Sequence, residues 1–167
     1  TDALCAIGNK IGADVPICLK GGTQYSISSG DMITAECAHN CVFLCIYPDF
    51  TLSTAEAYTK YDENPTVINP HYADFVSSIV CGSLSDGAKY ISNVFTGIYH
   101  DRRIDEIKND ILSAGAISSE MTGSGSVVFG IFESAEKAGA AMDILSEKYH
   151  DVFTAYPVDC GVAVVER

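Results

Sequence analysis

Basic side chains are scarce in this sequence of 167 residues. It has 10 Lys and Arg against 22 Asp and Glu, which gives a formal net charge of −12 at pH 7. Binding to nucleic acid or to an anionic membrane depends on clustered Lys and Arg that neutralise phosphates, so this composition excludes both kinds of partner. It does not exclude one anionic metabolite held by backbone amides. Any phosphate site in this chain is therefore expected to be built from amides rather than from cationic side chains.

Long apolar runs are also missing, although hydrophobic residues make up 47% of the sequence. No uninterrupted run approaches the roughly 20 residues that a membrane-spanning helix needs. The first residues, Thr1-Asp2-Ala3-Leu4, contain neither an initiator Met nor the basic region of a signal peptide. Apolar residues have helical spacing from the start, so we expect an N-terminal truncation. The length and composition predict one globular domain, or one domain plus a fragment of another.

The sequence has no CxxC pair, although it contains seven cysteines. Three of them, Cys37, Cys41 and Cys45, are spaced four residues apart, and His39 lies between the first two. A metal site is one interpretation, but buried thiols acting as small hydrophobes are the commoner alternative. We therefore expect no metal site. Free thiols indicate a reducing compartment, so the expected location is the cytoplasm.

Hydrophobic periodicity and turn residues predict the secondary structure. Helices are expected at residues 1–10, 55–62, 70–81, 84–99, 103–114 and 134–148. Strands are expected at residues 17–19, 23–27, 32–34, 42–47, 127–132, 152–155 and 161–165. From residue 38 onward this order suits an α+β fold with helices on one face of a mostly antiparallel sheet. Residues 1–36 are expected to be the remnant of a separate unit, and residues 37–167 a complete domain.

Asp14 is the first candidate for chemistry. It stands between Gly12-Ala13 and Val15-Pro16, and the proline disfavours a helix that continues through this point. A carboxylate held there can act as the general base that takes the proton of an alcohol as the alcohol attacks a phosphoryl group. The commoner alternative is a solvated or capping Asp in a turn.

A second candidate is the stretch Thr122-Gly-Ser-Gly-Ser126, which precedes a predicted buried strand. Glycines allow close backbone approach, and successive amides can form a concave anion site. The alternative is an ordinary loop, and it is not a P-loop, because GxxxxGK[ST] occurs nowhere in the sequence. The pair Arg102-Arg103 fits a solvated helix face about as well as a phosphate clamp. Tyr58 could stack on a base, although core packing is the commoner use of such a ring. Composition and spacing leave the reaction open.

Longer matches connect these candidates to a family. Ile11-Gly-Ala-Asp-Val-Pro16, followed by Lys20-Gly-Gly-Thr23 and Ser29-Gly-Asp-Met-Ile33, resembles the 4-diphosphocytidyl-2-C-methyl-D-erythritol kinases of the GHMP kinase superfamily. Tyr47-Pro48, Leu52-Ser-Thr-Ala-Glu-Ala-Tyr58 and Met121-Thr-Gly-Ser-Gly-Ser126 match the same family in the right order. The resemblance covers essentially the whole chain.

The resemblance implies a kinase of the non-mevalonate isoprenoid pathway. Such an enzyme transfers the γ-phosphate of ATP, with Mg²⁺, to the 2-hydroxyl of a cytidyl-diphosphate-linked methylerythritol. By the motif match, Asp14 would be the catalytic base, and Gly123, Ser124 and Gly125 would support the phosphate loop. Thr54 would contact the substrate, and Tyr58 falls where the family places an aromatic ring against cytosine.

The chain departs from the family pattern in its N-terminal half. The family's catalytic Lys and its PxxxGLGGGSS-type phosphate loop have no counterpart here. The resemblance therefore implies the tail of a GHMP N-terminal domain at residues 1–36 and a complete, ferredoxin-like C-terminal domain at residues 37–167. We expect little or no kinase activity and no tight binding of ATP or Mg²⁺ by this chain alone.

Two alternatives remain open. One is another small-molecule kinase of the superfamily, of the homoserine or mevalonate type. The other is a non-catalytic binding module that self-associates as a homo-oligomer through an exposed truncated face.

Overall fold

The computed structural model describes residues 2–12, 14–26, 32–35, 41–63, 72–80 and 84–163. The chain forms two compact units: unit 1 comprises Thr1–His39 with Pro157–Arg167, and unit 2 comprises Asn40–Tyr156. The predicted boundary between residues 36 and 37 falls among residues outside the described ranges, so it stays a prediction. Each unit is considered by itself below.

Unit 1 contains two short helices and a hairpin. The helices are α1 (Asp2–Gly8) and α2 (Val15–Lys20), and the antiparallel strands are β1 (Thr23–Ser26) and β2 (Met32–Ala35). The strand predicted at residues 17–19 is wrong, because these residues form the middle of α2. Pro16 lies in the first turn of that helix, where its fixed φ is suitable and its missing N–H needs no partner.

The C-terminal segment of unit 1 runs beside the end of α2. The amide of Gly22 donates to the carbonyl of Val158 at 2.8 Å, and the amide of Gly161 donates to that of Lys20 at 3.1 Å. A strand was predicted at residues 161–165. Its described part, residues 161–163, has no strand pairing, so that part of the prediction is wrong.

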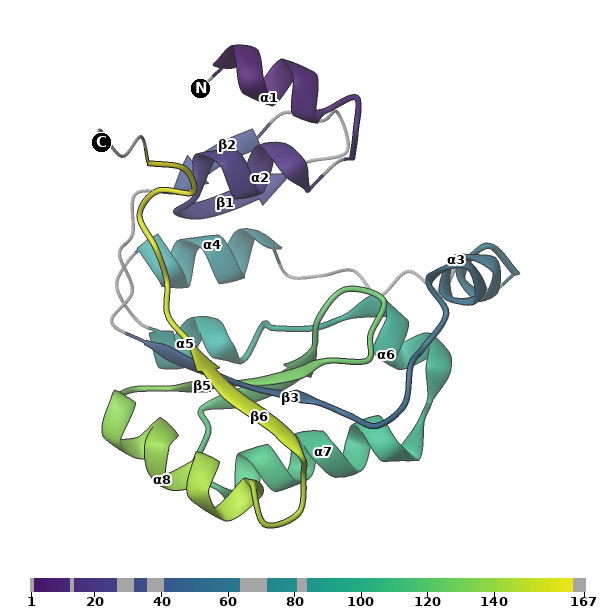
Figure 1. The fold of residues 1–167 in the computed structure, drawn as a ribbon, viewed down its shortest axis with the longest axis vertical. Helices are drawn as coiled ribbons and strands as arrows, with labels where there is room; N and C mark the ends of the chain where they lie inside the picture. The colour runs from purple at the N-terminus through teal and green to yellow at the C-terminus, as the bar shows by residue number, and fades with distance from the viewer. Residues whose placement is uncertain are drawn as a thin grey trace. The chain divides into compact units, whose positions relative to one another are not determined.

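Unit 2 is built on a four-stranded antiparallel sheet in the order β4-β5-β3-β6. Figure 1 labels β5, β3 and β6 of this sheet. Its strands are β3 (Val42–Tyr47), β4 (Ser118–Met121), β5 (Val128–Phe132) and β6 (Asp151–Ala155). Its helices are α3 (Thr54–Glu63), α4 (Tyr72–Val80), α5 (Leu84–Ala88), α6 (Val94–Tyr99), α7 (Arg102–Ser113) and α8 (Ala135–Leu145). Helices separate β3 from β4 and β5 from β6, which is the split βαβ arrangement of ferredoxin-like domains. The predicted α+β fold is confirmed.

Two sequence predictions in unit 2 need correction. The helix predicted at residues 84–99 is interrupted, because α5 ends at Ala88 and α6 begins at Val94. Strand β4 was not predicted, and its sequence, Ser-Ser-Glu-Met, lacks the β-branched residues that would signal a strand. Its pairing with β5 places it in the sheet.

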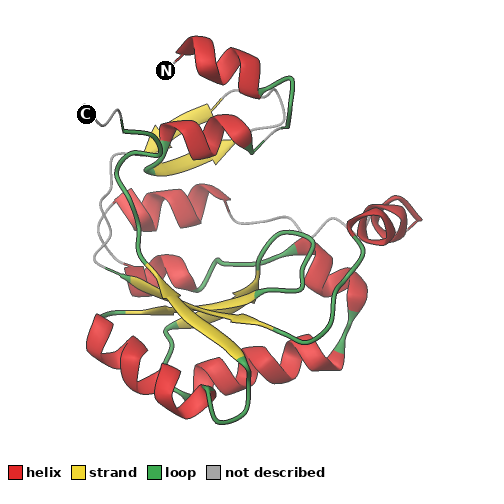
Figure 2. Ribbon diagram, viewed as in Figure 1, coloured by secondary structure: helices red, strands yellow, loops and turns green. Residues whose placement is uncertain are grey.

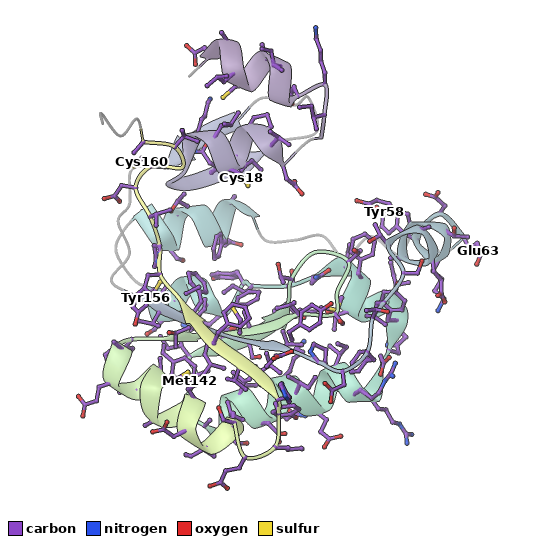
Figure 3. All side chains as sticks on the ribbon, viewed as in Figure 1. Cys18, Tyr58, Glu63, Met142, Tyr156 and Cys160 are labelled. Atoms are coloured by element: carbon purple, nitrogen blue, oxygen red, sulfur yellow. The ribbon has the colours of Figure 1, made fainter. Side chains whose placement is uncertain are left out.

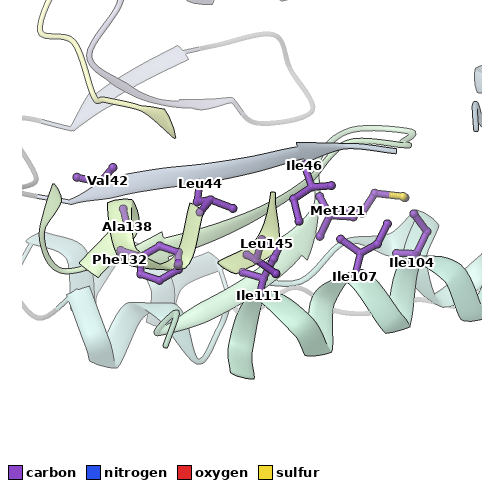
Figure 4. Packing of buried hydrophobic residues seen from close by; sticks show 12 residues of the cluster. Val42, Leu44, Ile46, Ile104, Ile107, Ile111, Met121, Phe132, Ala138 and Leu145 are labelled. Atoms are coloured by element: carbon purple, nitrogen blue, oxygen red, sulfur yellow. The ribbon is translucent and has the colours of Figure 1, made fainter. Parts of the chain in front are cut away.

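The core of unit 2 lies between the sheet and helices α7 and α8. The sheet contributes Val42, Leu44, Ile46, Met121, Val128 and Phe132, and the helices contribute Ile104, Ile107, Ile111, Ala138, Ala141 and Leu145. The strand residues alternate, and the α7 isoleucines recur every three or four positions, so each element presents one apolar face. Figure 4 shows these two faces meeting. No helix in the described ranges is both long and apolar enough to cross a membrane.

Polar side chains also join α7 to the residues that follow α8. The Lys148 ammonium donates to Glu106 Oε1 at 2.6 Å and to Asp110 Oδ2 at 2.7 Å. The Tyr149 hydroxyl donates to the same Asp110 oxygen at 2.6 Å. The hydrogen bond from Lys148, and then that from Tyr149, lower the pKa of Asp110. Burial, and then the bond to Asp110, raise the pKa of Tyr149 to about 12.

We expect Gly130→Ala to destabilise unit 2. An added Cβ in β5 would lie 2.2 Å from Ile111 Cγ2, and Ile111 is fully buried. Overpacking of this kind costs about 1–3 kcal/mol. Gly139→Ala in α8 is the control, because nothing lies within 4 Å of its added Cβ. The control should be neutral or stabilise by up to about 1 kcal/mol. Urea unfolding measures both, and equal midpoints would contradict the packing described.

We expect Asp110→Asn to lower stability in a pH-dependent way. The folded pKa of Asp110 is lowered, so its stabilisation is present above its ordinary pKa of 3.8 and is lost as the pH falls through the lowered value. The stability difference between wild type and variant should therefore be largest near neutrality and shrink below about pH 4. Urea midpoints from pH 7 to pH 2 measure it. Asp143→Asn, at an exposed position of α8, is the charge-matched control. A constant difference for Asp110→Asn would rule out the ionised contact.

Candidate functional site

The loop of residues 121–126, here the Gly/Ser loop, joins β4 to β5 (Figure 2). The amide of Thr122 donates to the Val127 carbonyl at 2.9 Å, and the amide of Gly125 donates to the Thr122 carbonyl at 3.1 Å. Gly123 and Gly125 have φ values of 57° and 93°, which L side chains rarely adopt. The sequence thus places glycine at the two points of this tight turn where the backbone has a positive φ.

Asn93 holds the first half of the Gly/Ser loop. Its Nδ2 donates to the carbonyls of Met121 at 2.7 Å and Gly123 at 2.8 Å. Its Oδ1 accepts from the amide of Phe95 at 2.9 Å, which caps the N-terminus of α6. Sequence reasoning missed this residue because a continuous helix was expected there. The Ser92-Asn93 pair before Val94 was the available sign of a helix start.

The connection from β3 to α3 holds the other half of the loop. The Ser126 hydroxyl donates to the Phe50 carbonyl at 2.6 Å. The hydroxyls of Thr54 and Ser124 share a hydrogen bond of 2.7 Å, which joins two of the predicted site residues. Gly125 lies so close to Leu52 that an added Cβ would meet Leu52 Cδ1 at 2.7 Å. The structure thus brings Thr54 to the Gly/Ser loop, and its predicted contact with substrate stays a prediction.

Within the described ranges, three amide nitrogens of the loop, those of Gly123, Ser124 and Ser126, donate to no acceptor. Ser126 is only 4% exposed, which leaves Gly123 and Ser124 as the two free amides near solvent. Gly123 is exposed and Ser124 half-buried, so both groups can be reached from solvent. Neighbouring amides that are free and accessible are suited to bind an anion.

A hollow of about 330 Å³ adjoins the loop. It is lined by the residues before and at the start of α6, by the end of β4 and the loop, and by Phe129. At its wall, Glu120 is buried, with 7% of the residue exposed. It accepts hydrogen bonds from Thr96 at 2.7 Å, from Lys108 at 2.9 and 3.0 Å, and from the Met121 amide at 2.8 Å. Because its oxygens are engaged in this way, Glu120 has a structural rather than a catalytic environment.

Tyr58 projects from α3 and is 57% exposed (Figure 3). Its ring meets that of Phe95 edge to face, with centroids 5.1 Å apart. The contact holds the ring without burying it, so part of it remains available to a ligand. The predicted contact with cytosine stays a prediction.

The basic pair Arg102-Arg103 begins α7, and Arg103 makes contacts within the protein. Arg103 donates to both oxygens of Asp101, at 3.0 and 2.7 Å, and its guanidinium lies 3.8 Å from the centroid of the Phe50 ring. The bond from Arg103 lowers the pKa of Asp101. These contacts favour a structural role for Arg103 over a phosphate clamp.

Asp14 belongs to unit 1, whereas the other predicted site residues all belong to unit 2. It is the N-cap residue of α2, is exposed, and makes no capping hydrogen bond. Its carboxylate is therefore accessible, and its role as base stays a prediction.

The cysteines have mixed environments. Cys41 is buried and Cys45 half-buried, and burial raises the pKa of both thiols. Cys18 and Cys160, which lie outside this group of three, are exposed. Cys37 lies outside the described ranges. Among the described residues, no group of three or more His, Cys, Asp or Glu is placed to hold a metal ion.

The fold and the motifs agree with comparisons to known proteins. Residues 91–151 match the family described as GHMP kinases C terminal. A solved 4-(cytidine 5'-diphospho)-2C-methyl-D-erythritol kinase aligns with a TM-score of 0.72 at 19% identity, over 90% of this chain and 55% of its own. Homoserine kinase from Cytophaga hutchinsonii aligns with a TM-score of 0.71 at 20% identity, over 88% of this chain and 52% of its own. The chain thus contains a GHMP kinase C-terminal domain.

Sequence identity to curated proteins points to one kind of kinase within this superfamily. The chain is 33% identical over 155 residues to 4-diphosphocytidyl-2-C-methyl-D-erythritol kinase of Clostridium novyi, which covers 91% of the chain and 55% of the relative. It is 34% identical over 154 residues to the enzyme of the same name from Caldanaerobacter subterraneus, covering 90% and 51%. The chain spans about half the length of these curated relatives. The predicted resemblance to this kinase family is confirmed.

We expect Gly125→Ala to disrupt the Gly/Ser loop more than backbone strain alone would. Besides the positive φ, the added Cβ would meet Leu52 and the Met121 sulfur, each at 2.7 Å. Gly115→Ala is the matched control, because its φ is 99° and nothing lies within 4 Å of its added Cβ. The control should cost about 1–2 kcal/mol of strain, and Gly125→Ala clearly more. Urea unfolding compares them, and equal losses would contradict the close packing of the loop on Leu52.

Proposed function

We propose that this chain is the C-terminal portion of an ATP-dependent kinase that phosphorylates the 2-hydroxyl of 4-diphosphocytidyl-2-C-methyl-D-erythritol. The observation that carries the proposal is the 33% identity to a kinase of that name over 91% of the chain. The structural likenesses support the fold alone, and they include a homoserine kinase to a similar degree. No contact among the described residues favours homoserine, mevalonate or a purely self-associating role.

By the motif match the Gly/Ser loop supports a phosphate loop, which stays a prediction, and we infer that it also binds an anion itself. Its free amides at Gly123 and Ser124 suit phosphate oxygens and need no cationic side chain, which agrees with a net charge of −12. ATP, when bound, supplies the transferred phosphoryl group, and Mg²⁺ neutralises its charge. Among the described residues, no three His, Cys, Asp or Glu side chains are placed together to hold the ion.

The remaining roles follow from the site residues. Asp14 takes the proton of the attacking 2-hydroxyl, a role that requires an accessible carboxylate such as this one. Thr54 orients the substrate from the start of α3, where Ser124 fixes its hydroxyl. Tyr58 stacks on the cytosine with the part of its ring that Phe95 leaves exposed. The reaction is cytoplasmic.

A chimera tests the activity and Asp14 together. The chain alone should show little or no turnover with ATP and Mg²⁺. Joined to the N-terminal part of the Clostridium novyi relative, it should phosphorylate 4-diphosphocytidyl-2-C-methyl-D-erythritol in preference to homoserine or mevalonate. Asp14→Asn in the chimera should lower kcat about 10²–10⁴-fold, since it removes the general base. Asp143→Asn removes the same charge from an exposed site on α8 and should leave kcat unchanged.

Two results would contradict the proposal. Preferential phosphorylation of homoserine or mevalonate would reject the substrate. Full activity of the Asp14→Asn chimera would reject the assignment of the base.

A further inference from the structure

Asn93 donates two hydrogen bonds to the Gly/Ser loop, and one of them fixes the direction of a backbone N–H group. In a trans peptide the C=O and the following N–H point in opposite directions. The peptide between Gly123 and Ser124 is trans. Asn93 Nδ2 holds the Gly123 carbonyl at 2.8 Å, so the Ser124 N–H is turned away from Asn93. That N–H is one of the two free amides.

The other free amide is oriented by the loop itself. Gly123 N–H belongs to the peptide whose carbonyl is that of Thr122, and this carbonyl accepts from the Gly125 amide at 3.1 Å. The Gly123 N–H is therefore directed without help from a side chain. Of the two amides, only that of Ser124 depends on Asn93 for its direction, which provides an internal comparison within one loop.

Asn93 is itself held in place. Its Oδ1 accepts from the Phe95 amide at 2.9 Å, which fixes the side chain to the start of α6. Further along that helix, the Thr96 hydroxyl donates to Glu120, whose carboxylate also accepts from the Met121 amide at 2.8 Å. The carbonyl of Met121 in turn accepts from Asn93 at 2.7 Å. Helix α6 and the end of β4 are thus bonded at both sides of Met121, so Asn93 has a fixed position relative to the loop.

We propose that Asn93 is a positioning residue that aims the Ser124 amide at the phosphate group which the Gly/Ser loop binds. The proposal rests on the proposed function for the nature of the ligand. The orientation of the amide, by contrast, is a property of the chain without ligand and can be measured separately.

Three variants of the full 167-residue chain separate this role from simple stabilisation. Asn93→Ser keeps a good helix cap but has too short a side chain to reach both carbonyls. Asn93→Asp also keeps the cap, and it places an oxygen where Nδ2 donates. Asn109→Asp adds the same charge at an exposed position of α7 and is the control.

The first measurement uses no ligand. Amide ¹⁵N relaxation should give Ser124 an order parameter of about 0.85 in wild type and Asn109→Asp. In Asn93→Ser and Asn93→Asp the value for Ser124 should fall toward about 0.6, while the order parameters of β5 stay unchanged. A Ser124 amide that remains as rigid in both Asn93 variants as in wild type would overturn the positioning role.

The second measurement titrates the same proteins with inorganic phosphate and follows amide chemical shifts. In wild type, Gly123 and Ser124 should both respond. In Asn93→Ser the Ser124 response should need about tenfold more phosphate, since a hydrogen bond to a charged group contributes roughly that factor. The Gly123 resonance should still shift on phosphate binding. An unchanged Ser124 response in Asn93→Ser would overturn the proposal. If no wild-type amide responds, the anion-binding function fails, and the order parameters still decide whether Asn93 positions the loop.

Discussion

The packing of α7 against the sheet determines where the rest of unit 2 lies. Ile104, Ile107 and Ile111 are almost fully buried, and each buried side chain of this size contributes about 1.5–3 kcal/mol. Gly130 allows β5 to approach Ile111 within a distance that no side chain would permit. Because β4 pairs with β5, this contact also sets the position of the Gly/Ser loop between them. Lys108 in the middle of α7 also donates to Glu120 at the end of β4, which adds a polar contact between this helix and the wall of the hollow.

The loop shows how an acidic protein can bind an anion. Its support comes from neutral groups: the Asn93 amide, the hydroxyls of Thr54 and Ser126, and the loop's own backbone. The bonds from Asn93 and Gly125 use carbonyl oxygens of the loop and leave the N–H groups of Gly123 and Ser124 free, which gives the loop a local positive potential without any Lys or Arg. Glu120, the nearest buried carboxylate, is neutralised by Lys108 at 2.9 Å. Its charge therefore opposes an anion less than an unpaired carboxylate would.

Sequence patterns predicted the elements whose own periodicity is strong. The strand at residues 42–47 and the helix at residues 103–114 correspond closely to β3 and α7, because their apolar faces are complete. Residues 17–19 were misassigned because three apolar residues fit a strand and a helix equally well. Strand β4 depends on pairing with β5 about 10 residues away, and Asn93 bonds a loop about 30 residues away. Local sequence patterns do not encode either partner. The hydrogen bond between Thr54 and Ser124 joins residues 70 positions apart. The sequence indicated each of these residues only separately, through its match to the kinase family.

The central claim is that backbone amides of the Gly/Ser loop bind phosphate. Replacing Ser124 by its α-hydroxy acid analogue converts one free N–H into an ester oxygen and keeps the side chain. The site predicts that this chain folds with the same circular dichroism spectrum and binds inorganic phosphate about tenfold more weakly, because one charge-assisted hydrogen bond is lost. Phosphate affinity equal to that of the all-amide chain would contradict the account.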